Sequence, residues 1–129
     1  MAGPQGAAGW STASSIDDVL ERMDAIADAH AAADGVATFD RMYRQVTRMV
    51  QEAELADRFG AGEFIGRLDV HFANLFFSAY EADLAGHPVP RAWAPLFEAR
   101  AKPDTHPIQF ALAGMNAHIS HDLSLAVVT

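Results

Sequence analysis

The sequence predicts an all-α protein, a compact bundle of about five helices. Three observations favour this fold class. Apolar residues recur at three- and four-residue spacing along most of the chain. Half of the 129 residues are hydrophobic, as expected of a globular domain that buries its own core. No segment alternates apolar and polar residues between turn signals, as a half-buried strand would.

The first part of the chain predicts a tail followed by a helix. Residues 1–13 are rich in Gly, Ala and Ser, and we expect a flexible tail from which Trp10 could dock onto the body. Residues 14–129 are expected to form a single helical domain. Ser15 has the character of an N-cap, and apolar residues at helical spacing predict a first helix over residues 16–31.

Two longer helices are expected next. The second follows Thr38, a potential N-cap, and ends at Gly60; its apolar residues form one stripe, so it is amphipathic. The third, over residues 63–84, is apolar on nearly every side. A helix of that kind is buried or lies at an interface.

A short helix is expected over residues 91–101, between two loops that contain proline. Pro107 suits the first turn of a last helix that continues to near the C-terminus and is also apolar almost all round. We therefore expect the third and last helices to be central in the bundle. Their large apolar surface also predicts self-association, most simply as a dimer.

Composition and charge restrict the partners. The chain has 9 Lys and Arg against 17 Asp and Glu, a formal net charge of -8. Such a surface repels nucleic acid and anionic membranes, so neither is expected as a partner. The chain has no cysteine, which excludes disulfides, thiol nucleophiles and cysteine-type zinc sites. With no recognisable signal peptide or membrane span, we expect a cytoplasmic protein.

The last helix carries an unusual group of polar residues in an apolar setting. At about 100° per residue, His118, His121 and Asp122 share one face, whereas Asn116 and Ser120 point away from it. A buried polar group without a partner costs about 1–3 kcal/mol. The cluster must therefore be satisfied by its own members, a ligand, a metal or water.

The helix over residues 63–84 repeats this pattern, because Asp69 and His71 lie on its apolar faces. If the two helices pack together, either residue could face the cluster. A carboxylate beside a histidine fixes the imidazole tautomer and raises its basicity, as general acid–base catalysis requires. Ordinary structural hydrogen bonds are the alternative interpretation of Asp69 and His71.

A metal site is the weaker interpretation of the same residues. Two histidines and an aspartate along a helix can bind a divalent metal, but the spacing H-x-x-H-D is a weak motif by itself. We therefore favour acid–base chemistry without a metal, and no particular cofactor is predicted.

Several segments together resemble a known family. These are "RMDAI", "DGVATFDRMYRQVT", "LDVHFANLFFSAY", "PRAWAPLFEA" and "QFALAGMNAHISHDLSLAVV". They resemble an uncharacterised bacterial family, largely actinobacterial, that is known as a domain of unknown function. The resemblance covers most of residues 20–128, and N-A-H-I-x-H-D-L is its most specific part. It implies a helical fold without an established activity. Members of the family usually continue beyond this signature, so we expect that the domain over residues 14–129 lacks a C-terminal part usual in the family.

Two functional hypotheses follow. In the first, the protein is a small helical enzyme that performs acid–base chemistry (cyclisation, isomerisation or hydrolysis) on a small hydrophobic molecule. Its expected catalytic residues are Asp69, Asn116, His118, His121 and Asp122. Its expected substrate-binding residues are His71, Phe72, Phe76 and Met115, although such aromatic residues are more often plain core. In the second, the protein is a non-catalytic module that binds a ligand or oligomerises, and the polar cluster specifies its packing.

Overall fold

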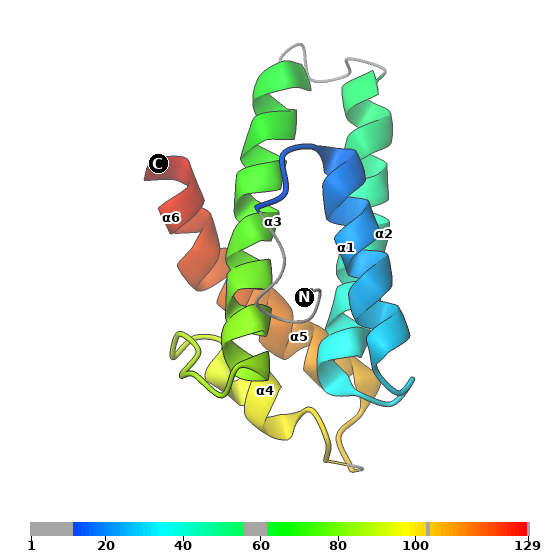
Figure 1. Ribbon diagram of the computed structural model, residues 1–129, viewed down its shortest axis with the longest axis vertical. Helices are drawn as coiled ribbons and strands as arrows, with labels where there is room; N and C mark the ends of the chain where they lie inside the picture. Colours follow the sequence, from blue (N-terminus) through cyan, green and yellow to red (C-terminus); the bar gives the residue numbers. More distant parts are fainter. Residues whose placement is uncertain (1–11, 56–61, 103, 129) are drawn as a thin grey trace, which may run out of the picture.

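The first three helices run side by side along the length of the molecule (Figure 1). They are α1 (Ile16–Ala29), α2 (Gly35–Leu55) and α3 (Gly62–Leu84). The computed structural model describes residues 12–55, 62–102 and 104–128. The expected tail falls largely outside these ranges, and Trp10 lies outside them too.

The chain after α3 crosses this layer and then turns along it. The short α4 (Ala94–Ala99) precedes α5 (Pro107–Ala117), which packs against α2 and α4. The chain continues through the π-helical segment η2 (His118–Asp122) into α6 (Leu123–Val128), which lies beside α3 (Figure 1). The predicted all-α bundle is confirmed. Among the described residues, no helix combines the length and the apolar character that crossing a membrane would require.

Local capping explains where the first two helices begin. The Ser15 hydroxyl accepts a hydrogen bond from Asp18 N at 3.1 Å, so α1 begins at the expected residue. The second helix begins at Gly35, earlier than predicted from Thr38. The reason is Asp34, whose carboxylate accepts a hydrogen bond from Ala37 N at 2.9 Å and thus supplies the cap.

The periodicity of the last helix predicted one continuous α-helix, but the structure interrupts it with a π-helical segment. At His118 it changes to π-helical geometry, and Leu123 N donates to His118 O, five residues earlier. The wider turn ends at Asp122, after which α6 resumes the ordinary geometry. Short π-helical segments within α-helices occur frequently at functional sites.

Two glycines allow α5 to approach α2 closely. A Cβ atom added at Gly35 would overlap the ring of Phe110, and one added at Gly114 would overlap the ring of Phe39. Each helix therefore presents a glycine to an aromatic ring of the other. Because Gly114 lies one helical turn before His118, this contact also sets how deeply His118 enters the core.

An ion-pair group joins the ends of three helices near α4. The Arg100 guanidinium donates to both carboxylate oxygens of Asp34, from Nε at 2.8 Å and from Nη2 at 3.1 Å. Its Nη1 donates to Asp83 Oδ2 at 2.7 Å. These bonds tie the end of α4 to the start of α2 and to the last turn of α3, and so hold the segment that carries Trp93.

One side of α5 and η2 is not covered. Ile108, Leu112 and Ile119 are 62%, 61% and 51% exposed. The sequence led us to expect that a helix apolar on most sides would be buried or lie at an interface. In the isolated chain, the inner side of α5 enters the core and its outer side remains exposed.

Candidate functional site

Asp122 is the centre of a buried hydrogen-bond group. Its Oδ2 accepts from Trp93 Nε1 at 2.9 Å and lies 2.8 Å from His118 Nδ1. Its Oδ1 lies 2.7 Å from His121 Nδ1. The Asp122 side chain is only 1% exposed, so these partners replace the water that would otherwise solvate it.

The partners of Asp122 define the tautomer of His118. The indole of Trp93 can only donate, so Asp122 Oδ2 acts as an acceptor, and a carboxylate oxygen then also accepts from His118 Nδ1–H. Burial lowers the pKa of His118, although the hydrogen bond and charge of Asp122 oppose this shift. At neutral pH the ring is therefore uncharged, and Nε2 carries a free lone pair.

His118 Nε2 has no hydrogen-bond partner, although the side chain is only 2% exposed. An imidazole lone pair without a partner in the interior is unusual, because its desolvation is not compensated. The other ring nitrogen is firmly held by Asp122. The arrangement is thus an oriented histidine with its basic nitrogen unoccupied.

Aromatic rings surround this imidazole. Phe72 of α3 stacks on it with an interplanar angle of 7° and a centroid separation of 3.5 Å. The ring of Tyr43 of α2 meets it at 4.7 Å in an edge-on arrangement. Farther rings that complete the surround are those of Trp93, Phe39 and Phe76. The imidazole is therefore packed mainly among aromatic rings.

Tyr43, whose ring contacts the imidazole, brings a further polar group, and Asp69 lies within electrostatic range of Tyr43. The Tyr43 side chain is 4% exposed, and its hydroxyl has no hydrogen-bond partner. Burial raises the pKa of Tyr43 well above its usual value, and the charges of Asp69 and Asp122 raise it further. Asp69 is partly buried one turn before Phe72 on α3. The structure thus places its carboxylate within electrostatic reach of the Tyr43 hydroxyl.

Asn116, one of the expected catalytic residues, lies outside this group. Its side chain is exposed, and its Oδ1 accepts a hydrogen bond from Ser120 Oγ at 3.2 Å. The structure therefore does not bring Asn116 together with His118 and Asp122, because two residues before His118 the helix presents the side chain to nearly the opposite side. Met115 is partly buried against the hydrophobic core, and Phe76 is fully buried within it.

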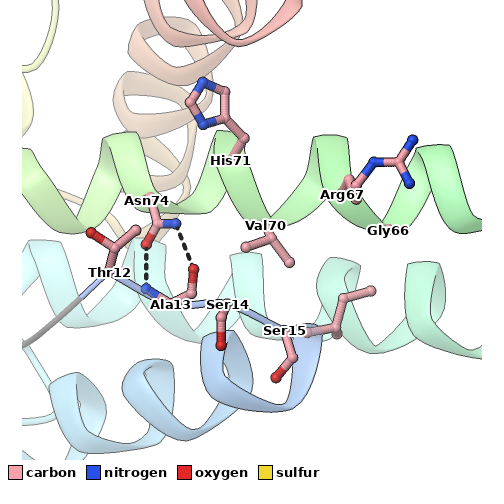
Figure 2. Close-up of a pocket in the computed structure, with 10 residues that line it drawn as sticks. Thr12, Ala13, Ser14, Ser15, Gly66, Arg67, Val70, His71 and Asn74 are labelled. Carbon is pink, nitrogen blue, oxygen red and sulfur yellow. Dashed lines mark hydrogen bonds between the residues drawn. The ribbon is translucent and has the colours of Figure 1, made fainter. Parts of the chain in front are cut away.

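His71 lies on a different feature from His118. It lines a pocket of ≈ 520 Å³ between α3 and the segment that precedes α1. Figure 2 shows that Asn74 points from α3 toward this segment, where its Oδ1 accepts from Ala13 N and its Nδ2 donates to Ala13 O, each at 3.0 Å. The bidentate contact buries Ala13 and fixes the segment on α3. The pocket shares no lining residue with the hydrogen-bond group around Asp122.

A second buried carboxyl group, that of Asp40, lies on α2 and does not belong to the hydrogen-bond group around Asp122. Asp40 is fully buried, and neither of its oxygens has a hydrogen-bond partner. Burial raises the pKa of Asp40 to about 8; the charge of Asp24 acts in the same direction, whereas those of Arg41 and Arg44 oppose it. Asp40 is therefore largely protonated at neutral pH.

Sequence analysis did not identify Tyr43 and Trp93 as site residues. Tyr43 belongs to the apolar stripe of α2, which marks it only as a core position. Trp93 carries a stronger signal, because a buried indole needs an acceptor for its N–H. That signal does not reveal which carboxylate supplies the acceptor. Over the residues that the structure describes, no group of three or more His, Asp and Glu side chains could hold a metal ion.

Comparison with known proteins places the chain in a family. The model of a family of unknown function, DUF5995, matches residues 16–129. No curated protein and no solved structure matches the chain. The matched range takes in every described helix, including η2 and its histidines. The chain therefore belongs to the family of unknown function DUF5995.

Proposed function

We propose that this protein is a small helical enzyme in which His118 acts as a general base on a small hydrophobic organic molecule. One observation carries the proposal. His118 Nε2 is buried without a partner, while Nδ1 of the same ring is held by Asp122. A histidine that served only to satisfy Asp122 would not require an unoccupied basic nitrogen on its other side.

The geometry suits proton transfer in two respects. Asp122 orients the imidazole and stabilises the imidazolium that forms when Nε2 takes a proton. Trp93 and His121 hold Asp122 in turn, so the base is supported by a fixed carboxylate. Burial also lowers the pKa of His118, which keeps Nε2 unprotonated at neutral pH.

The surroundings indicate the character of the substrate. The nearest neighbours of the imidazole are aromatic rings, which favour an apolar and preferably planar molecule. Phe72 covers the ring face and is partly exposed, whereas Phe39 and Phe76 behind it are fully buried. Of the aromatic rings named around His118, Phe72 is the one that is partly exposed, so movement of its side chain would uncover the imidazole face.

A non-catalytic module is the second candidate, and the burial of Asp122 favours it. Three side chains bond to one inaccessible carboxylate and so join η2 to the segment before α4. A buried polar group of this kind can specify a unique packing arrangement. On this interpretation, the fold tolerates the free-energy cost of leaving His118 Nε2 without a hydrogen-bond partner.

Replacing His118 with Gln separates the two candidates. Gln can still donate to Asp122 but cannot take up a proton at neutral pH. We would follow 4-nitrophenyl acetate hydrolysis and deuterium uptake by acetophenone in D₂O, together with urea unfolding. His30→Gln is the matched control, because His30 Nε2 bonds to Tyr80 Oη at the far end of α1.

The catalytic proposal expects the wild-type protein to accelerate at least one of the two reactions. His118→Gln should remain folded and lose about 10²–10⁴-fold of that rate, while His30→Gln retains it. If wild type and His118→Gln have equal rates and differ only in stability, the cluster is structural and the enzyme proposal fails.

A further inference from the structure

Two buried polar atoms without partners belong to rings that touch each other. They are His118 Nε2 on η2 and the Tyr43 hydroxyl on α2. The ring centroids are 4.7 Å apart with an interplanar angle of 69°. Both side chains are more than nine-tenths buried. Two neighbouring groups therefore both lack the hydrogen bond that buried polar atoms normally make.

The two groups are chemically complementary. His118 Nε2 is a lone-pair acceptor and a base, because Nδ1–H is directed to Asp122. The Tyr43 hydroxyl stays protonated at neutral pH, since burial raises its pKa, and it is therefore a neutral hydrogen-bond donor. A ligand that satisfies both must offer an oxygen to Tyr43 and, close to that oxygen, a proton to His118.

We propose that Tyr43 and His118 act together on small aromatic carbonyl compounds. Tyr43 donates a hydrogen bond to the carbonyl oxygen, and His118 removes a proton from the adjacent carbon. This inference rests on the proposed general-base role of His118 and adds the substrate class and a second catalytic residue. The corresponding reaction class is enolisation, followed by isomerisation.

The proton and electron balance of this step needs no further reactant. The C–H bond beside the carbonyl breaks as Nε2–H forms, and the electron pair moves into the carbonyl group to give an enolate. The Tyr43 O–H bond stays intact and stabilises the negative oxygen by hydrogen bonding. Return of the proton from Nε2 to the same carbon regenerates the substrate, and return to a conjugated carbon gives an isomer.

The aromatic surround supports a planar ligand. Phe72 lies flat on the imidazole at 3.5 Å, as the aromatic part of a bound substrate could lie. Because Phe72 is partly exposed, its side chain can turn toward the surface, whereas the fully buried rings of Phe39 and Trp93 cannot do so without repacking. Phe72 is thus the ring that a planar ligand would replace against the imidazole.

A direct hydrogen bond is the competing explanation. A shift of either side chain that brings the Tyr43 hydroxyl onto His118 Nε2 would satisfy both atoms without any ligand. In that case Tyr43→Phe would destabilise the fold, and the protein would show no preference for a ligand that carries an oxygen. The proposal expects the opposite, since removing a hydroxyl that has no partner leaves stability nearly unchanged.

The first test measures binding. 4-Fluorophenol offers both an acceptor oxygen and an O–H, and 4-fluorotoluene has a similar shape without either. By ¹⁹F NMR we expect wild type to bind 4-fluorophenol at least tenfold more tightly than 4-fluorotoluene. Tyr43→Phe should weaken phenol binding by about tenfold, the equivalent of one hydrogen bond. Tyr80→Phe is the matched control, because Tyr80 bonds to His30 and should bind the phenol as wild type does.

Equal binding of the two probes, an absence of phenol binding, or unchanged binding by Tyr43→Phe would each overturn the pairing of Tyr43 with His118. These outcomes do not depend on catalysis. They therefore test the ligand site separately from the proposed function.

The second test measures proton transfer with the same variants. Deuterium uptake at the methyl group of acetophenone should fall about 10²–10³-fold in Tyr43→Phe, as for other lost oxyanion donors, and should be unchanged in Tyr80→Phe. If His118→Gln loses the exchange while Tyr43→Phe keeps it, the role of Tyr43 is wrong and the general base stands. If wild type does not accelerate the exchange, carbonyl compounds are excluded as its substrate class.

Discussion

Trp93 Nε1 donates to Asp122 Oδ2 at 2.9 Å and so joins two segments that are 29 residues apart in the chain. The bond lies entirely in the interior, where Trp93 is fully buried. It connects the turn that begins α4 with the end of η2. Trp93 directly precedes α4, so the packing of α4 helps to fix the position of Asp122. Because Asp122 holds His118 Nδ1, the orientation of the imidazole depends on that packing too.

Replacing Asp122 with Asn should destabilise the protein by about 1–3 kcal/mol. Asn keeps one acceptor oxygen but places an NH₂ group against donors, so at least one of Trp93, His118 and His121 loses its acceptor. Urea unfolding gives the change in free energy. Asp24→Asn is the matched control, because Asp24 pairs with Arg44 at an exposed site and should change stability by no more than about 1 kcal/mol. A smaller effect at Asp122 than at Asp24 would contradict the buried network.

Gly114→Ala should destabilise the fold by about 1–3 kcal/mol, because the new Cβ overlaps Phe39. The sign of the change in stability shows whether the Cβ atom meets Phe39 or finds open space. Where space allows, Ala in place of Gly in a helix stabilises it by about 0.5–1 kcal/mol. In a double-mutant cycle, Phe39→Leu should reduce the cost of Gly114→Ala. A stabilising Gly114→Ala variant would show that α5 can move away from α2.

Asp40 should make stability fall as the pH rises from about 4 to about 8. In this window the folded carboxyl, with a pKa of about 8, keeps a proton that the unfolded one, with an ordinary value of 3.8, has released. Unfolding therefore releases a proton, and the free energy of unfolding falls by up to about 1.4 kcal/mol per pH unit. Asp40→Asn removes this contribution.

The measurement is the difference between Asp40→Asn and wild type in urea unfolding at several pH values. The variant should gain stability relative to wild type as the pH rises from 5 to 8. The lowered pKa of His118 acts in the other direction, mainly below pH 6.5, but it is common to both proteins and cancels in the difference. A constant difference across this range would show that Asp40 is not protonated in the fold.

Self-association remains a prediction, and the exposed side of α5 is where we expect it. Ile108, Leu112 and Ile119 follow one another along this side. Two copies of such a row can pair about a twofold axis. Leu112→Glu should shift the mass measured by light scattering toward the monomer without reducing the stability of the fold. A wild-type protein that stays monomeric at high concentration would contradict the prediction.

The helices could be predicted because their signals are local. Ser15 caps α1 where expected, and the periodicity of α3 gave its range within one residue. The start of α2 was missed because two potential caps, Asp34 and Thr38, lie close together and only the fold selects between them. The π-helical turn was missed because a change from i+4 to i+5 hydrogen bonding depends on how His118 and Asp122 pack, not on composition.

The candidate site was predictable to the extent that it lies on one helix. Spacing placed His118, His121 and Asp122 on a common face, and these three side chains do bond together. Trp93 and Tyr43 come from distant segments, so no periodicity relates them to His118. Asn116 lies within the same signature but on the outer surface, so membership in the signature does not by itself bring a residue into the group around Asp122.

The number of residues in the π-helical turn from His118 to Asp122 is itself constrained by the contacts on either side of it. Deleting one residue between His118 and Asp122 would change their spacing from i+4 to i+3. It would also rotate Asp122 and α6 by about 100° relative to α5, away from Trp93. The same deletion would carry Ala126 of α6 out of the core. In the exposed turn at Gly86, by contrast, a change of one residue disturbs no such partner. Insertions and deletions should therefore be tolerated least between His118 and Asp122, where the number of residues sets the carboxylate against both the imidazole and Trp93.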